Sequence, residues 1–200
     1  MATRDQGKAP RLSDLRTEEH KNYSDVRGGF RVGDILLFQG ECALSRVIRW
    51  LSHGPYSHSA LLAPAWDNRL LVMQAEATGV EMVPSSLAVD RYGGKVEWWA
   101  LKEEHRQQLD AKKFFTAMLD AIGKPYGFAR LLWLGLLLVL NRRQYIPDRK
   151  TSSYFCSQYV ASVLDRSGVK VDRLGEAGTT PTDFAQSGFF EYKATLHRGP

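Results

Sequence analysis

Residues 57–84 read SHSALLAPAWDNRLLVMQAEATGVEMVP, three apolar runs separated by two turn signals. The runs cover 57–63, 69–77 and 80–84, and the turn signals are Asp67–Asn68 and Thr78–Gly79. Short apolar runs bounded by Asn, Asp and Gly are typical of strands joined by turns. The stretch therefore predicts three consecutive strands of an antiparallel sheet.

The segments on either side add further strands and then helices. Strands are predicted at 35–38, 95–102 and 189–197, from apolar or alternating runs. Helices are predicted at 43–51, 103–122, 128–140, 154–167 and 180–188, from helical spacing and end signals. Strands followed by helices indicate an α+β fold, an antiparallel sheet or small barrel packed against helices.

The chain divides into a polar extension and one domain. Residues 1–29 are polar and charged and end in Arg27–Gly28–Gly29, which predicts an arm that is poorly ordered unless it docks on a larger assembly. Residues 30–200 are expected to form a single domain. The hydrophobic content of 44% and charged content of 24% are ordinary for a globular protein.

Composition argues against several functional classes. The net charge of +5 comes from scattered basic residues, so no nucleic-acid partner is expected. Residues 1–20 lack the apolar core of a secretory signal, and the longest apolar run, 131–140, is about half a membrane span. We therefore expect a soluble, cytoplasmic protein for which peripheral membrane contact stays open. An extracellular substrate would require release by lysis, injection or a phage particle.

Two cysteines, Cys42 and Cys156, make no disulfide framework and no metal-ligand pattern, so no metal and no cofactor are expected. Cys156 falls in the first turn of the predicted helix 154–167. Free N–H groups and the positive end of the helix dipole favour a thiolate there, which is the nucleophilic form. The alternative is a small buried apolar cysteine, the commoner fate. Cys42 also precedes a helix but stands in a loop context, and we treat it as a bystander.

A reactive thiol needs a base, and His58, at the start of a predicted central strand, is the best of five histidines. It could equally be a hydrogen-bonded structural histidine. The next strand carries Glu76, whose carboxylate could reach the imidazole ring. The alternative is a glutamate that faces solvent at the end of a strand. Gln74 lies on the same strand face and is the fallback orienter.

Read in order, these segments resemble a known family. GDILLF, GPYSHSALL, QAEATGVEMVP, GKPYGF, YFCSQYV and TPTDFAQSG follow one another as in the circularly permuted NlpC/P60-type papain-like cysteine hydrolases, the YiiX/YaeF-like group. The resemblance covers about 32–190 and places the histidine before the cysteine. It implies Cys156 as nucleophile, His58 as base and Glu76 as orienter. It also implies that Tyr56 and Ser157 line the substrate or oxyanion pocket.

Three functions remain open. The resemblance favours a cysteine amidase or peptidase that forms a thioester acyl-enzyme, with cell-wall peptides as candidate substrates. The alternatives are a thiol acyltransferase or lipid esterase, and a non-catalytic binding or virion-associated module. The surroundings of the apolar helix 128–140 distinguish the two enzyme hypotheses. We expect it to be a core helix covered by the sheet and by helix 103–122, beside a polar cleft; an apolar groove leading to Cys156 would favour a lipid substrate.

Overall fold

A computed structural model describes residues 19–66, 69–140, 152–171 and 178–197. Its centre is one seven-stranded sheet with the strand order β1-β7-β6-β2-β3-β4-β5. Neighbouring strands are antiparallel except β1 and β7, which are parallel. The strands are β1 (His20–Asn22), β2 (Ile35–Gln39), β3 (His58–Trp66), β4 (Arg69–Glu76), β5 (Gly79–Pro84), β6 (Lys95–Leu101) and β7 (Phe190–His197). The three strands predicted within 57–84 are therefore confirmed.

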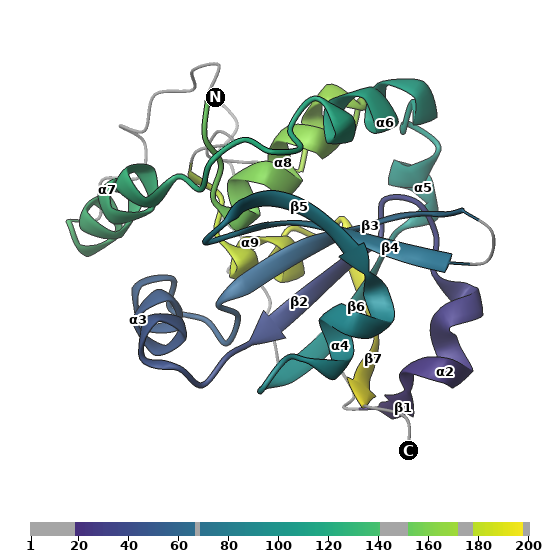
Figure 1. Ribbon diagram of the computed structural model, residues 1–200, viewed down its shortest axis with the longest axis horizontal. Coiled ribbons are helices and arrows are strands. Elements are labelled where there is room, and N and C mark those ends of the chain that lie inside the picture. Colours follow the sequence, from purple (N-terminus) through teal and green to yellow (C-terminus); the bar gives the residue numbers. More distant parts are fainter. Residues whose placement is uncertain (1–18, 67–68, 141–151, 172–177, 198–200) are drawn as a thin grey trace, which may run out of the picture.

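The helices lie on both faces of the sheet (Figure 1). They are α2 (Tyr23–Val26), α3 (Ala43–Leu51), α4 (Ser85–Asp90), α5 (Glu103–Arg106), α6 (Ala111–Leu119), α7 (Phe128–Val139), α8 (Cys156–Arg166) and α9 (Pro181–Gln186), with a 3-10 turn at Arg27–Gly29. α6 and α8 pack on one face, and α4 packs on the other.

The central strand β2 shows why the sheet is covered twice. Successive side chains of a strand point to opposite faces. Ile35 and Leu37 belong to the core beneath α6 and α8, whereas Leu36 and Phe38 belong to the core beneath α4. All four side chains are buried. The continuous apolar run of β2 is therefore the mark of a strand that is buried on both sides.

Three sequence predictions need correction. The helix predicted at 103–122 is two helices, because Asp110 interrupts it. The side chain of Asp110 accepts a hydrogen bond from the N–H of Lys113 (3.0 Å), and its own N–H donates to the carbonyl of Ser167 (2.8 Å). Asp110 thus caps the start of α6 and ties it to the end of α8.

The second correction concerns the predicted N-terminal extension. Within it, β1 pairs with β7, and Tyr23 is buried and shares a 2.6 Å hydrogen bond with the hydroxyl of Ser85. The folded part therefore begins before residue 30. Residues 1–18 lie outside the described residues.

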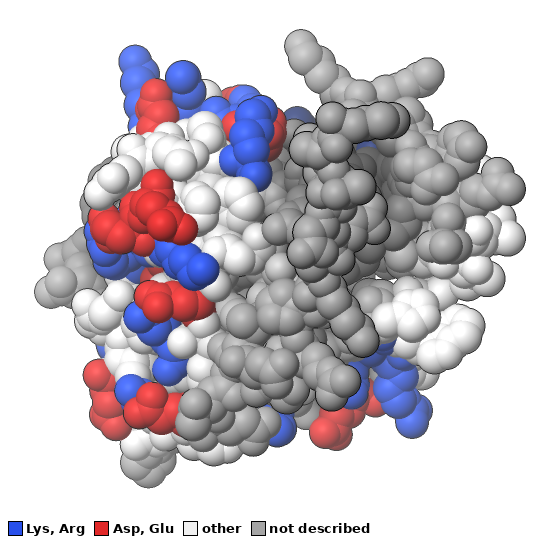
Figure 2. All heavy atoms as spheres, turned by 180° about the vertical axis from the view of Figure 1, so that it is seen from behind, with Lys and Arg blue, Asp and Glu red and all other residues white. Residues whose placement is uncertain are grey.

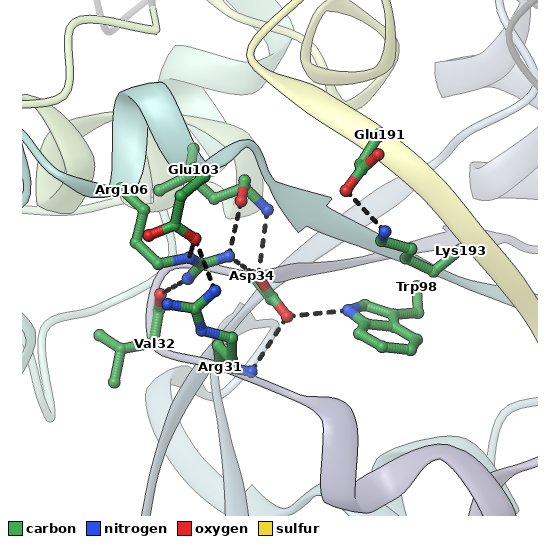
Figure 3. A network of polar contacts seen from close by, with 9 residues as sticks. Arg31, Val32, Asp34, Trp98, Glu103, Arg106, Glu191 and Lys193 are labelled. Atoms are coloured by element: carbon green, nitrogen blue, oxygen red, sulfur yellow. Dashed lines mark hydrogen bonds and ion pairs between the residues drawn. The ribbon is translucent and has the colours of Figure 1, made fainter.

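A buried carboxylate, Asp34, fixes the turn before β2 (Figure 3). It forms an ion pair with Arg106 of α5 (2.6 Å) and accepts hydrogen bonds from the indole of Trp98 (2.9 Å) and the N–H of Leu101 (3.1 Å). It also accepts from the N–H of Arg31 (3.0 Å). One side chain therefore joins the start of β2, the strand β6 and the helix α5.

Helix α7 does not lie in the core as predicted. Leu132 (74% exposed) and Val139 (59%) face solvent, and only Leu134, Gly135 and Leu137 are buried. Its neighbour is α3, which has no buried residue. Figure 1 shows the two helices side by side at one end of the molecule, away from α2.

Charged side chains of both signs are mixed over the described part of the face in Figure 2. Exposed cations pair with neighbouring carboxylates, as in Arg166 with Asp120 (2.7 Å) and Lys170 with Asp165 (2.5 Å). None of the described helices has both the length and the apolar character needed to cross a membrane.

Candidate active site

Cys156 is the first residue of α8 and is buried, with 4% of its surface exposed. The N-cap residue, Phe155, has no side chain that can cap the helix. The first N–H groups of α8 are therefore left for other acceptors. The backbone N–H of Ser157 donates to the sulfur of Cys156, as does that of Ser59 on β3. The sulfur thus lies where an uncapped helix N-terminus meets a strand.

His58 begins β3 and lies beside this sulfur. Its Nε2 donates to Oε1 of Gln74 (3.2 Å) and is 3.2 Å from Oε1 of Glu76. Nδ1 is then the nitrogen that remains for the hydrogen bond between His58 and Cys156. The antiparallel register of β3 and β4 explains the arrangement, because it brings both β4 side chains next to the start of β3.

The electrostatics favour a thiolate–imidazolium pair. Burial alone would lower the pKa of His58, but the adjacent Cys156 and then Glu76 and Gln74 outweigh it and raise that pKa to about 9. Burial alone would raise the pKa of Cys156, but the charge and hydrogen bond of His58, with the N–H groups of Ser59 and Ser157, lower it. The nucleophilic form of the sulfur is therefore stabilised at neutral pH.

Glu81 is a functional candidate that the sequence analysis missed. Its Oε1 accepts a hydrogen bond from Nε2 of Gln74 (3.1 Å). A carboxylate can only accept hydrogen bonds, so the amide nitrogen of Gln74 must face Glu81. The amide oxygen of Gln74 then faces His58. Strand alternation offered a signal, because the β4–β5 register places Glu81 opposite Gln74.

Two residues that the resemblance assigned to the substrate or oxyanion pocket have other neighbours. The hydroxyl of Tyr56 donates to Oε2 of Glu97 (2.5 Å), and its ring packs edge-on against Trp99. It is fully buried and supports the sheet from within. The hydroxyl of Ser157 donates to the carbonyl of Thr179 (2.7 Å), which joins α8 to the segment before α9. Ser157 does line the pocket described below.

Tyr126 also interacts with the site, although the sequence analysis gave it no role. Burial, followed by the charges of Cys156 and Glu76, raises the pKa of its hydroxyl far above the usual value. The phenol therefore stays protonated at neutral pH. The only sequence signal was its place in the segment GKPYGF.

A pocket of about 260 Å³ opens at Cys156 between α3 and α7. Its walls are mostly aliphatic, whereas a polar cleft was expected at Cys156. The polar pocket, which borders His58, Gln74 and Glu76, is a separate one that Cys156 does not line. α7 lines the aliphatic pocket because one of its sides faces α3 rather than the sheet. The lining side chains include Val47, Ile48 and Leu51 of α3 and Leu131, Leu134 and Leu138 of α7.

The pH dependence of thiol alkylation tests the pairing of His58 with Cys156. In a Cys42→Ser background, iodoacetamide is expected to modify Cys156 at nearly the same rate at pH 6 and pH 8, because the imidazolium maintains the thiolate until its own pKa of about 9. With His58→Ala, the rate at pH 6 should fall by roughly tenfold or more and rise about tenfold per pH unit, as for an ordinary thiol.

The Cys42→Ser background is needed because Cys42 is exposed and its own pKa is lowered by hydrogen bonds from Ser45. Alkylation is followed by intact mass. Parallel pH profiles for Cys156 with and without His58 would show that the imidazole does not control the thiol.

The fold of this chain is found in a protein of known structure. No family model and no curated protein matches the sequence of the chain. In the described residues, no group of three or more His, Cys, Asp or Glu side chains is placed to hold a metal ion. The crystal structure of the metalloprotein YiiX from Escherichia coli O157:H7 matches with a TM-score of 0.58 and 18% identity, covering 82% of this chain and 97% of that chain. The chain therefore has the α+β fold of YiiX, as the resemblance of the ordered segments to the YiiX/YaeF-like group predicted.

Proposed function

We propose that this protein is a cysteine hydrolase that takes substrates with a long acyl chain. The observation that carries the proposal is the aliphatic pocket between α3 and α7, which Cys156 helps to line. The fold is shared with a permuted papain-like protein, which supports a hydrolase of this class.

The chemistry uses Cys156 and His58 in turn. The thiolate attacks the acyl carbonyl carbon and forms a C–S bond, and the carbonyl electrons move to the oxygen. The tetrahedral intermediate collapses, the bond to the leaving group breaks, and the imidazolium of His58 donates its proton to that alcohol or amine. Neutral His58 then takes a proton from water, which attacks the thioester and releases the fatty acid and the thiol.

Two features support stabilisation of the oxyanion. The uncapped N-terminus of α8 presents N–H groups and the positive end of a helix dipole at Cys156. The second is the hydroxyl of Tyr126, whose pKa is raised by burial and then by the charge of Cys156, so that it stays neutral at the pH of the reaction. Glu76 and Gln74 contact Nε2 of the His58 ring and orient it, and Glu81 accepts a hydrogen bond from Gln74.

An acyl substrate fits this pocket better than a cell-wall peptide. Each methylene group transferred from water to an aliphatic wall contributes about 0.8 kcal/mol. A polar peptide would lose hydration there without gaining hydrogen bonds from leucine and valine side chains. The amide chemistry predicted from the sequence stays within the proposal, because the same steps cleave an acyl amide or an acyl ester.

The direct test is a chain-length series of acyl esters and acyl amides, with muropeptides as the comparison. We expect kcat/KM to rise from acetyl to palmitoyl substrates. Intact-mass analysis after rapid quenching should show a thioester on Cys156. Cleavage of muropeptides with no chain-length preference would support the peptidase instead. A chain never acylated at Cys156 by any of these substrates would support the non-catalytic module.

Filling the pocket should remove the preference for long chains. Ile48 lines the pocket and is only partly buried, so Ile48→Trp adds bulk without opening the core. We expect kcat/KM for palmitoyl esters to fall at least tenfold while acetyl esters are turned over as before, because only the long chain needs the occupied volume.

The matched control is Met82→Trp on β5, an exposed apolar residue (45%) outside the pocket. It should leave both substrates unaffected. An equal loss on short and long esters with Ile48→Trp would mean that the pocket does not hold the acyl chain.

A further inference from the structure

The exposed apolar side chains of the described residues are concentrated on two helices. We define the α3–α7 face by six of them: Leu44, Val47 and Trp50 of α3 and Leu132, Trp133 and Leu136 of α7. Each is about half exposed or more, and Trp50 reaches 70% and Leu132 74%. Figure 1 shows both helices at one end of the molecule. A patch of this kind on a monomer usually has a partner.

The charges within these helices indicate the partner. α3 (ALSRVIRWL) and α7 (FARLLWLGLLLV) contain Arg46, Arg49 and Arg130 and no acidic residue. Two copies meeting through this face would bring arginines together with no carboxylate from either helix to pair with them. An anionic lipid surface supplies the missing charge.

The residue types also suit a bilayer surface. Tryptophan is favoured at the boundary between headgroups and acyl chains, and leucine and valine below it. Helices with an apolar side and flanking arginines bind in the plane of that boundary. Neither helix can cross a membrane, so the two would lie on it.

We propose that the α3–α7 face docks this protein on bilayers that contain anionic phospholipid. The pocket at Cys156 opens between the same two helices. A docked molecule would therefore receive an acyl chain directly from the bilayer, which is how this inference extends the proposed function. The docking itself does not depend on turnover.

The test measures binding of the full chain, as Cys156→Ala, to phosphatidylcholine vesicles with and without phosphatidylglycerol. Co-sedimentation is expected with the anionic vesicles, weaker without phosphatidylglycerol and weaker at high salt. Tryptophan emission should shift to the blue on binding. Trp50→Ala should weaken binding about tenfold, since a tryptophan loses its place in the membrane. Arg46→Glu should weaken it at least fivefold, through the reversed charge.

Matched controls lie on the exposed part of α6. Leu119→Ala and Lys112→Glu change the same kinds of side chain away from the face and should bind as the parent does. Thermal unfolding checks that each variant is folded. The proposal is overturned by absence of vesicle binding, or by binding that Trp50→Ala and Arg46→Glu leave unchanged. A stable dimer that dissociates with Trp50→Ala and binds no vesicles would assign the face to a second copy.

Because the protein tested carries Cys156→Ala, failure to bind vesicles would leave the chain-length result standing. Conversely, a protein that binds vesicles but shows no acyl-chain preference would retain the docking surface and lose the proposed function.

Discussion

Cys156→Ala is expected to reduce the turnover of acyl substrates by at least a thousandfold. In the proposed mechanism the sulfur is the atom that forms the covalent intermediate. No second thiol is near, because Cys42 is the N-cap of α3 and makes its contacts with Ser45. His58→Ala should cost a comparable factor, since it removes both the partner of the thiolate and the proton donor for the leaving group. Steady-state kinetics on a palmitoyl ester measure both losses.

The double variant makes this prediction sharper. Residues that act as one unit show strongly non-additive effects. Cys156→Ala with His58→Ala should therefore be about as slow as Cys156→Ala alone. Cys42→Ser is the matched control and should keep full turnover. Retention of activity in Cys156→Ala would remove this cysteine from the mechanism, and an additive double loss would argue that the two side chains act in separate steps.

Asp34→Ala is expected to lower the free energy of unfolding by about 3–5 kcal/mol. The substitution leaves the guanidinium of Arg106, itself only 10% exposed, without its 2.6 Å partner. It also removes the acceptor for the indole of Trp98 and for the N–H of Leu101. For a chain of 200 residues this corresponds to a fall in Tm of about 10 °C.

The control is Glu103→Ala, which removes an exposed partner of Arg31 (2.6 Å) and a longer contact to Arg106 (3.8 Å) at the edge of the same network (Figure 3). Surface ion pairs contribute about 0–1 kcal/mol, so Tm should change little. Urea unfolding gives both free energies. Similar small losses for the two variants would mean that water replaces the contacts of Asp34, contrary to its burial.

The sequence determined where most of the longer helices and strands lie, because short-range patterns encode them. The helix predicted at 43–51 is α3 to the residue, and the capped helix predicted at 180–188 contains α9 with its Thr180–Asp183 capping box. Position at a helix N-terminus also depends on local sequence, so Cys156 could be chosen as a candidate nucleophile without the structure.

The residues that contact this thiol were harder to predict from the sequence. The sequence limited the base to a few histidines and the orienter to Glu76 or Gln74, whereas the structure brings both next to His58. Glu81 and Tyr126 come from a neighbouring strand and a loop, and strand pairing and chain packing join them to the site. Such contacts depend on register and on long-range geometry, which no local pattern contains.

Helix α7 shows most clearly what only the tertiary structure decided. The sequence of residues 128–140 determined that the segment is helical and apolar, and hence that its side chains favour an environment away from water. It did not determine which environment, because the hydrophobic effect is non-directional and scales with area. The position of α7 against α3, beside Cys156, leaves side chains such as Leu132 and Leu136 both lining a pocket and exposed at the surface. That packing makes the same apolar residues a candidate substrate site and a candidate membrane surface instead of a core.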